Sequence, residues 1–205
     1  MISFDKNKIE NLPHLHKINL INSATGYKSA NLIGTKSKEG IANLAIFSSV
    51  THYGSSPAIY GFVLRPTTVA RNTYDNIKAT GVFTINPVFE ATLADAHHTS
   101  AKYDKAISEF DKTIFEEEYK DNCQAPFVKN APIQLAMRFL EEHPIKRNGT
   151  LLILAEVEKL YVNKKLLEED YFINLTKGKI ACINGLDGYT VPTKTSRFAY
   201  QRPKI

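Results

Sequence analysis

The sequence predicts a mainly β (α+β) protein built around one antiparallel barrel. Three observations support this fold class: about six or seven apolar segments have the length of strands, turn residues separate them, and the few helical patterns do not alternate regularly with strands. The 205 residues, 43% hydrophobic and 23% charged, exclude collagen, intrinsic disorder and a disulfide scaffold. We expect a single domain over residues 1–205, with a core of about residues 25–190 and a C-terminal tail over residues 190–205.

Three strands are expected in the first part of the chain. They cover Ser29–Thr35, Ile41–Val50 and Ala58–Leu64, where apolar residues dominate. Two clusters of turn residues separate them, Ser37–Gly40 and Gly54–Pro57. The three segments are therefore expected to form the first part of the sheet.

The hydrophobic period then changes to that of a helix. Residues Ala70–Ala79 form a short amphipathic pattern, with Thr67 or Thr68 as the expected N-cap and Gly81 as the C-terminal stop. A further strand is expected over Val82–Asn86. It ends at the proline that follows, because proline has no N–H group for a ladder.

The middle of the chain is expected to leave the barrel. A short helix fits Glu90–His97, and the charged segment Ala101–Tyr119 carries only scattered large apolar residues. This pattern predicts an insertion of helices and loops on the surface, between Glu90 and Lys129.

A hairpin is expected after this insertion. Its strands cover Ile133–Glu142 and Leu151–Val162. Between them, Arg147-Asn148-Gly149 indicates a type I′ turn, because Asn-Gly supplies the positive φ angles that this turn requires.

The positive charge is unevenly distributed. The chain has a net charge of +5, and the whole surplus falls within residues 1–88. In that part, Gly40–Tyr74 contains no Asp, Glu or Lys, and its only charged side chains are Arg65 and Arg71. A long apolar and hydroxyl-rich segment with two isolated arginines is unlike a solvated face.

The two arginines lie around the predicted helix start, with the hydroxyl groups of Thr67, Thr68 and Thr73. Unpaired N–H groups at a helix N-terminus favour an anion, and a guanidinium binds phosphate through two parallel hydrogen bonds. The spacing leaves two interpretations open: an anion site, or a capped helix with surface ion pairs. The absence of acidic residues from the segment favours an external anion.

Four short motifs follow one another in an order and spacing typical of one family. They are Asn43-Leu-Ala-Ile-Phe-Ser48, Arg71-Asn-Thr-Tyr-Asp-Asn-Ile77, Gly81-Val-Phe-Thr-Ile-Asn86 and Gly185-Leu-Asp-Gly-Tyr189. In this order they resemble the flavin reductase-like, FMN-binding split-barrel family, over about residues 25–200. The resemblance implies a split β-barrel that forms a homodimer and holds FMN near the subunit interface.

The resemblance also implies which residues hold the cofactor. The strand ending in Phe47 to Val50 is similar to the one that lies along the flavin ring, and Arg71 and Thr73 match the phosphate-binding motif. Asn72 replaces the aspartate of that motif. The candidate cofactor-binding residues are Phe47, Ser48, Ser49, Val50, Thr51, Arg65, Thr67, Thr68, Arg71, Asn72, Thr73, His98, Thr99 and Ser100.

Two adjacent histidines, His97 and His98, allow two interpretations. They approach the flavin or a substrate and supply a proton, with His98 as the candidate catalytic residue, or they cap a helix end and face solvent. Tyr189 is likewise either a core aromatic beneath a glycine loop or a contact to the flavin. No spacing of metal ligands is present, so we expect no metal site.

The expected function is that of an oxidoreductase in which bound FMN, with FAD as the alternative, accepts hydride from NADH or NADPH. Electrons then pass to free flavin or a small acceptor; a non-catalytic flavin carrier is the other hypothesis. The isolated Cys123 and Cys182, and the lack of a long apolar segment, predict a cytoplasmic protein. We expect a homodimer, with no nucleic-acid or membrane partner.

Overall fold

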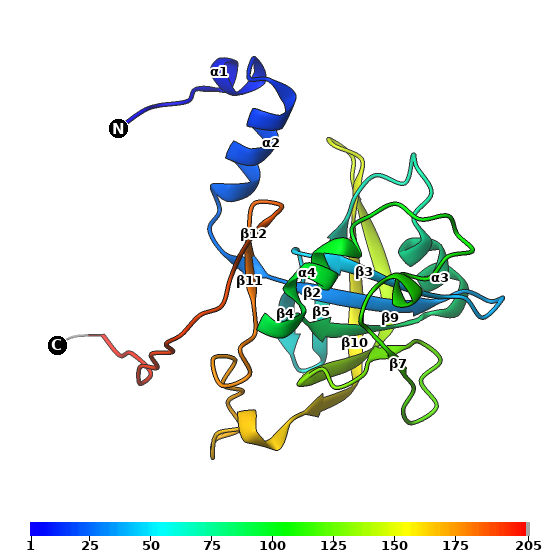
Figure 1. The fold of residues 1–205 in the computed structure, drawn as a ribbon. Coiled ribbons are helices and arrows are strands. Elements are labelled where there is room, and N and C mark those ends of the chain that lie inside the picture. The colour runs from blue at the N-terminus through cyan, green and yellow to red at the C-terminus, as the bar shows by residue number, and fades with distance from the viewer. Residues whose placement is uncertain (204–205) are drawn as a thin grey trace.

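The computed structural model describes residues 1–203, and its centre is one antiparallel sheet of seven strands (Figure 1). In spatial order the strands are β3 (Ala42–Phe47), β2 (Asn31–Lys36), β6 (Val82–Pro87), β9 (Ile133–Ile145), β10 (Thr150–Val162), β5 (Ala58–Leu64) and β4 (Thr51–Ser55). Every neighbouring pair is antiparallel. The mainly β fold class is therefore confirmed.

The link between the two edge strands forces this sheet to close. β3 and β4 lie at opposite edges, yet only Ser48, Ser49 and Val50 connect them. A flat sheet of seven strands is about 29 Å wide, at about 4.8 Å between neighbours. The step from Phe47 to Thr51 spans at most about 14 Å. The sheet must therefore curl until its edges approach each other, which makes it a barrel.

The strand expected over Ile41–Val50 is shorter in the structure. Its pairing with β2 ends at the pair Asn31 and Phe47, because the chain then crosses to the other edge of the sheet. Residues 51–55, which we did not expect as a strand, pair with β5. The turn expected at Gly54–Pro57 is consequently shorter, since Gly54 already belongs to β4.

The helix α3 (Asn72–Thr80) confirms the change of period, and Gly81 ends it with φ 74°. The expected N-cap is wrong: Arg71, not Thr67 or Thr68, holds that position, and no side chain caps the helix. The helix begins later because the residues before Arg71 form a loop. Ile77 on its inner face is fully buried in the barrel core.

The long β9–β10 hairpin lies where the sequence predicted it, but its turn differs. Residues 146–149 form a four-residue loop in which Gly149 alone has a positive φ, 72°. The expected type I′ turn needs two such residues, so that prediction is wrong. Two register shifts interrupt the pairing, at Leu140 in β9 and at Glu158 in β10. On their other sides, β9 pairs with β6 and β10 pairs with β5.

The insertion contains η1 (Glu90–Thr92), α4 (Leu93–His98), η2 (Glu109–Lys112), β7 (Glu117–Glu118) and β8 (Phe127–Val128). We expected it on the surface, but Phe110 and Phe115 are each only 6% exposed. They belong to a second core with Leu32 and Leu44, on the outer face of β2 and β3. The insertion is buried because that face of the sheet is also apolar.

Both ends of the chain extend from the barrel on the same side (Figure 1). The helices α1 (Lys6–Glu10) and α2 (His14–Ser23), which we did not predict, contain no buried residue. We call this helical segment the N-terminal arm. A small sheet consists of β1 (Lys28–Ser29), β11 (Cys182–Asn184) and β12 (Gly188–Thr190), and the short helix η3 (Lys164–Leu166) lies between β10 and β11 in the chain. No helix within residues 1–203 is long and apolar enough to span a membrane.

The barrel interior is built around aromatic contacts. Phe62 packs edge to face against Phe47, at 4.9 Å between ring centroids, and against Phe83, at 5.7 Å. Phe62 and Phe83 are each 1% exposed. Phe47, the last residue of β3, is therefore anchored in the core while the chain beyond it leaves the sheet.

We expect Gly34→Ala to lower the free energy of unfolding by about 1–3 kcal/mol. A Cβ atom at Gly34 in β2 would collide with the carbonyl oxygen of Pro126 and lie 2.6 Å from Thr84 Oγ1. Gly54→Ala in β4 is the control, because its nearest neighbour would be 3.4 Å away. Urea unfolding of both variants tests this; equal losses would show that the close approach at Gly34 is unimportant.

Candidate functional site

A cavity of about 740 Å³ lies where the end of β3, the start of α3, the end of α4 and the β11–β12 hairpin meet. Its volume is within the range of small-molecule sites. Of the candidate cofactor-binding residues, it brings together Phe47, Ser48, Ser49, Arg65, Arg71, Asn72, Thr73, Thr99 and Ser100. Val50, Thr51, Thr67, Thr68 and His98 are outside its lining.

A buried hydrogen-bond network fixes α3 against the sheet. The Asn43 amide donates to the hydroxyl of Thr35, at 3.3 Å, and to that of Thr73, at 3.1 Å. The Asn76 amide donates to the same Thr35 hydroxyl, at 3.1 Å. Because buried polar groups are costly unless they are paired, these four residues hold the start of α3 at a defined place beside β3.

The start of α3 is rich in hydrogen-bond donors. The backbone N–H groups of Asn72 and Thr73 have no acceptor among residues 1–203, and both residues line the cavity. Arg71 donates from Nε to the Pro66 carbonyl at 3.4 Å. Within the described chain, neither Arg65 nor Arg71 forms an ion pair with a carboxylate. This end of the cavity is therefore suited to an anion.

The two serines after β3 differ in their roles. The Ser49 hydroxyl donates to the Val63 carbonyl, at 3.1 Å, and accepts from the Val63 N–H group, at 3.0 Å. Ser49 thus joins the β3–β4 link to β5, and its side chain is occupied by the protein. Ser48 makes no such side-chain hydrogen bond within residues 1–203, so it is the serine free to contact a ligand.

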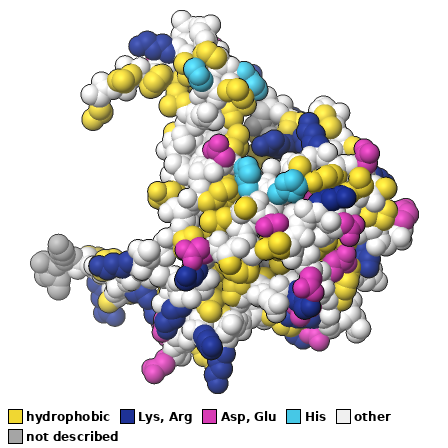
Figure 2. All heavy atoms as spheres, in the orientation of Figure 1, with side chains coloured by type: hydrophobic (Ala, Val, Ile, Leu, Met, Phe, Trp, Pro, Cys, Tyr) yellow, Lys and Arg dark blue, Asp and Glu magenta, His cyan; other side chains and the backbone are white. Residues whose placement is uncertain are grey.

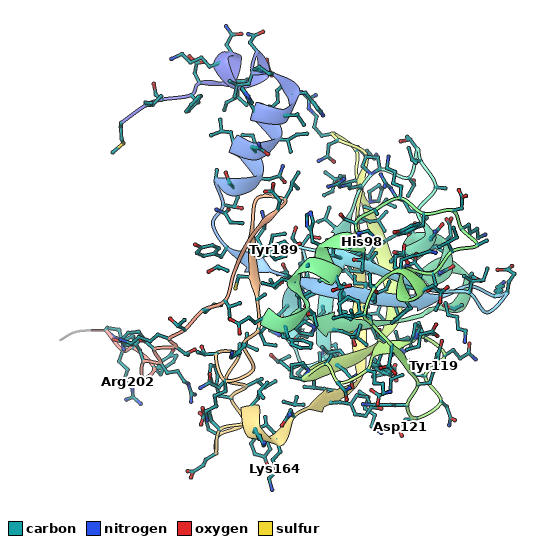
Figure 3. The ribbon with its side chains drawn as sticks, in the orientation of Figure 1. His98, Tyr119, Asp121, Lys164, Tyr189 and Arg202 are labelled. Carbon is teal, nitrogen blue, oxygen red and sulfur yellow. The ribbon has the colours of Figure 1, made fainter. Side chains whose placement is uncertain are left out.

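The two histidines face different partners. His97 lines the cavity, and its Nδ1 lies 3.0 Å from the hydroxyl of Tyr189 on β12. His98 Nε2 lies 2.6 Å from the hydroxyl of Tyr103 instead. Figure 3 shows Tyr189 on its hairpin beside the helix that carries His98. Of the two, His97 is the one placed at the cavity, because consecutive helical residues point in different directions.

Acidic residues also line the cavity, although the segment Gly40–Tyr74 contains none. Asp75, Asp104, Glu109 and Asp187 all contribute to the lining. Three of them are exposed, but Glu109 is only 5% exposed. The sequence did not reveal Glu109 as a site residue, because it lies in a charged segment far from β3 in the chain.

Glu109 is held at the open edge of β3. Its Oε2 accepts a hydrogen bond from the N–H group of Leu44, at 2.9 Å. Burial raises the pKa of the Glu109 carboxyl, and the hydrogen bond from Leu44 partly offsets this rise. The residue therefore connects the insertion to the same strand that leads to the cavity.

The chain belongs to the flavin reductase family: residues 27–179 match the flavin reductase like domain. A split-barrel protein of the flavin reductase type from Shewanella frigidimarina NCIMB 400 is 38% identical, with a TM-score of 0.94 over 98% of this chain and 100% of that one. The barrel described above is thus the split barrel of flavin reductases, as the resemblance predicted.

More distant structures share the fold. Nitrilotriacetate monooxygenase component B from Bacillus cereus is 17% identical, with a TM-score of 0.85 over 97% of this chain and 98% of that chain. An FMN-binding protein from Thermus thermophilus is 15% identical, with a TM-score of 0.73 over 96% of this chain and 99% of that chain. At these identities the likeness concerns the fold alone.

We expect Glu109→Gln to remove a pH dependence of stability. The folded chain binds the Glu109 proton more tightly than the unfolded chain, whose carboxyl keeps a pKa near 4.5. Its contribution to stability is therefore complete below about pH 4.5 and is lost as pH rises through the folded-state pKa. Urea unfolding from about pH 7.5 to about pH 5 should show the wild type gaining stability relative to Glu109→Gln; a constant difference would contradict this.

Proposed function

We propose that this chain is an FMN-dependent oxidoreductase that accepts hydride from NADH or NADPH and passes electrons to free flavin or another small acceptor. Membership of the flavin reductase family supports the reaction class. The observation that carries the proposal is the uncapped start of α3, with Arg65 and Arg71, in a cavity of ligand size.

The α3 end of the cavity fits the phosphate of FMN. Unpaired N–H groups at a helix start, together with two guanidiniums, match the charge and the acceptor oxygens of a phosphate monoester. The Thr73 side chain accepts from Asn43, so its own hydroxyl hydrogen remains available to donate. FAD, the alternative cofactor, would present a phosphate to the same groups.

The β3 end of the cavity fits the ring. When bound, the flavin supplies hydride and electron transfer, so the chain has to bind and orient it. Phe47 is anchored in the core by Phe62, and Ser48 follows it at the cavity wall. Backbone N–H groups of the segment from Phe47 to Val50 are proposed as donors to a bound ring. The FMN-binding protein from Thermus thermophilus shares this fold, which supports FMN as the cofactor.

The nicotinamide donor is proposed to bind transiently in the remainder of the cavity. The sequence contains no G-x-G-x-x-G loop of a dinucleotide-binding domain. The rest of the lining comes from residues of the insertion and from Leu186 and Tyr189 of the C-terminal hairpin. This part of the cavity is proposed to receive the donor first and the acceptor afterwards.

A flavin carrier without turnover is the second candidate, because the same contacts to phosphate and ring would serve a protein that only binds the flavin. The two functions are separated by adding NADH or NADPH to the FMN-loaded protein without oxygen. Bleaching of the flavin absorbance supports the oxidoreductase, whereas an unchanged spectrum with both nucleotides supports the carrier. A protein that is isolated colourless and binds no added FMN excludes both.

We also propose a homodimer formed through the two extended ends of the chain. The arm and the tail expose Leu15, Ile21, Phe198 and Tyr200, and hydrophobic side chains lie along this concave side of the molecule (Figure 2). Exposed apolar groups of this kind are typical of interfaces. Light scattering tests this: a monomer mass at micromolar concentration would exclude the dimer.

The free thiols of Cys123 and Cys182 support a reducing compartment such as the cytoplasm.

We expect Arg71→Ala to weaken FMN binding about 10- to 100-fold and riboflavin binding by less than about threefold. The reason is that riboflavin lacks the phosphate, so it does not use the guanidinium. Quenching of flavin fluorescence measures both affinities. Arg138→Ala, on an exposed part of β9 outside the cavity, is the control and should change neither. Equal losses for both flavins would show that Arg71 is structural.

A further inference from the structure

Glu109 is a buried carboxylate that neither the barrel nor the proposed phosphate site explains. It is 5% exposed, and its carboxylate accepts two backbone hydrogen bonds, one from the Leu44 N–H group to Oε2 and one from the N–H group of Glu109 itself. No Lys, Arg or His of the described chain forms an ion pair with it. No other residue of the described chain donates a side-chain hydrogen bond to the carboxylate, which has acceptor capacity left on the cavity side.

A buried carboxylate without a cationic partner is costly for a protein. If Glu109 only fastened the insertion to β3, a glutamine would accept the same hydrogen bond from Leu44 without the cost of a charge. A carboxylate that lines a ligand cavity and lacks a cationic partner is instead suited to accept hydrogen bonds from a ligand. Such an acceptor favours hydroxyl groups and repels anions.

Asn43 adds a second acceptor on the same side of the cavity. Its two amide hydrogens are both used, by the hydroxyls of Thr35 and Thr73. Its oxygen, Oδ1, has no hydrogen bond within the described chain, although the residue is only 6% exposed and lines the cavity. Glu109 meets Leu44, and Asn43 precedes Leu44 in β3, so the two acceptors flank one point of the strand.

The cavity thus has two kinds of polar wall. The start of α3 offers donors and positive charge, which suit a phosphate, and the edge of β3 offers acceptors, which suit hydroxyl groups. A molecule with a phosphate at one end of a polyhydroxylated chain satisfies both. We infer that Glu109 and Asn43 bind the hydroxyl groups of the cofactor's sugar-alcohol chain and make the site selective for flavins that carry such a chain.

This inference rests on the proposed function, since it presupposes a flavin in the cavity. The alternative is that Glu109 serves only the fold, by holding the insertion at the edge of β3. The two roles differ in one respect: a structural role affects all flavins equally, whereas a hydroxyl-binding role affects only those with a hydroxylated chain.

The first experiment compares three flavins on the wild-type protein at about pH 8, where carboxyl groups are ordinarily ionised. The probes are FMN, riboflavin, which lacks the phosphate, and lumiflavin, which carries a methyl group in place of the hydroxylated chain. Fluorescence quenching gives each dissociation constant. We expect riboflavin to bind about 10-fold or more tightly than lumiflavin, the usual effect of a hydrogen bond to a charged group.

The second experiment repeats the measurements with Glu109→Gln. Glutamine retains the size of the side chain and an oxygen for the Leu44 N–H group, but it places an amide donor where Oε1 was an acceptor. FMN and riboflavin should each bind about 10-fold more weakly, and lumiflavin should be unaffected. Asp111→Asn, an exposed carboxylate on the same short helix that does not line the cavity, is the matched control and should alter no affinity.

The outcomes are separable. Equal weakening of all three flavins by Glu109→Gln, or no weakening, would overturn the inference and leave the proposed function intact. Equal affinity of the wild type for riboflavin and lumiflavin would do the same, and this result does not depend on whether the variant folds. Failure of the wild type to bind FMN would instead remove the proposed function and the inference with it.

Discussion

The connection from β3 to β4 is the constraint on which the structure depends. Three residues must join the two edges of a seven-stranded sheet, so the sheet cannot stay open. The link is fastened on both sides: the Ser49 hydroxyl pairs with the backbone of Val63, and the Ser29 hydroxyl donates to the Val50 carbonyl at 3.1 Å. Where the chain leaves β3 to make this crossing, its backbone is no longer covered by a neighbouring strand, and the cavity forms at that place.

The polar groups of the cavity belong to elements that the closure of the barrel brings together. α3 closes the barrel with Ile77 in the core, and the amides of Asn43 and Asn76 share the hydroxyl of Thr35. The bonds from Asn76 to Thr35 and from Asn43 to Thr73 connect α3 to the sheet, so a shift of α3 would break both buried hydrogen bonds at once. The uncapped start of the helix is therefore held beside β3, and the donors that a phosphate needs are in place before any ligand binds.

Local sequence patterns were sufficient for elements that the hydrophobic period defines. β5, β6, β9 and β10 lie within about a residue or two of their predicted starts, because their apolar residues face one barrel core. The boundary between β3 and β4 was missed, since apolar residues continue to Val50 while the chain already changes edges. The burial of Phe110 and Phe115 was also missed, because it depends on the outer face of β2 and β3, which no pattern within the insertion reveals.

The same distinction holds for the candidate site. Arg65, Arg71 and Thr73 were found because they lie in one acid-free segment next to a predicted helix start. Glu109 was not, because it reaches the site by a contact with Leu44, 65 residues away in the chain. His98 was named as the candidate catalytic residue, whereas His97 is the one that lines the cavity. Adjacent positions in a sequence do not show which of two side chains faces a cavity that the fold assembles.

A cationic helix start alone would accept many phosphate compounds, since its interaction is chiefly with charge. Selectivity requires a group that penalises the wrong ligand as well as one that stabilises the right one. A buried carboxylate does both: it accepts from hydroxyl groups, and it repels any anionic group placed against it. Glu109 is nearly shielded from water, so its charge is poorly solvated when no ligand is bound. A ligand that brings hydroxyl donors to this carboxylate therefore gains more binding free energy than it would from an exposed one.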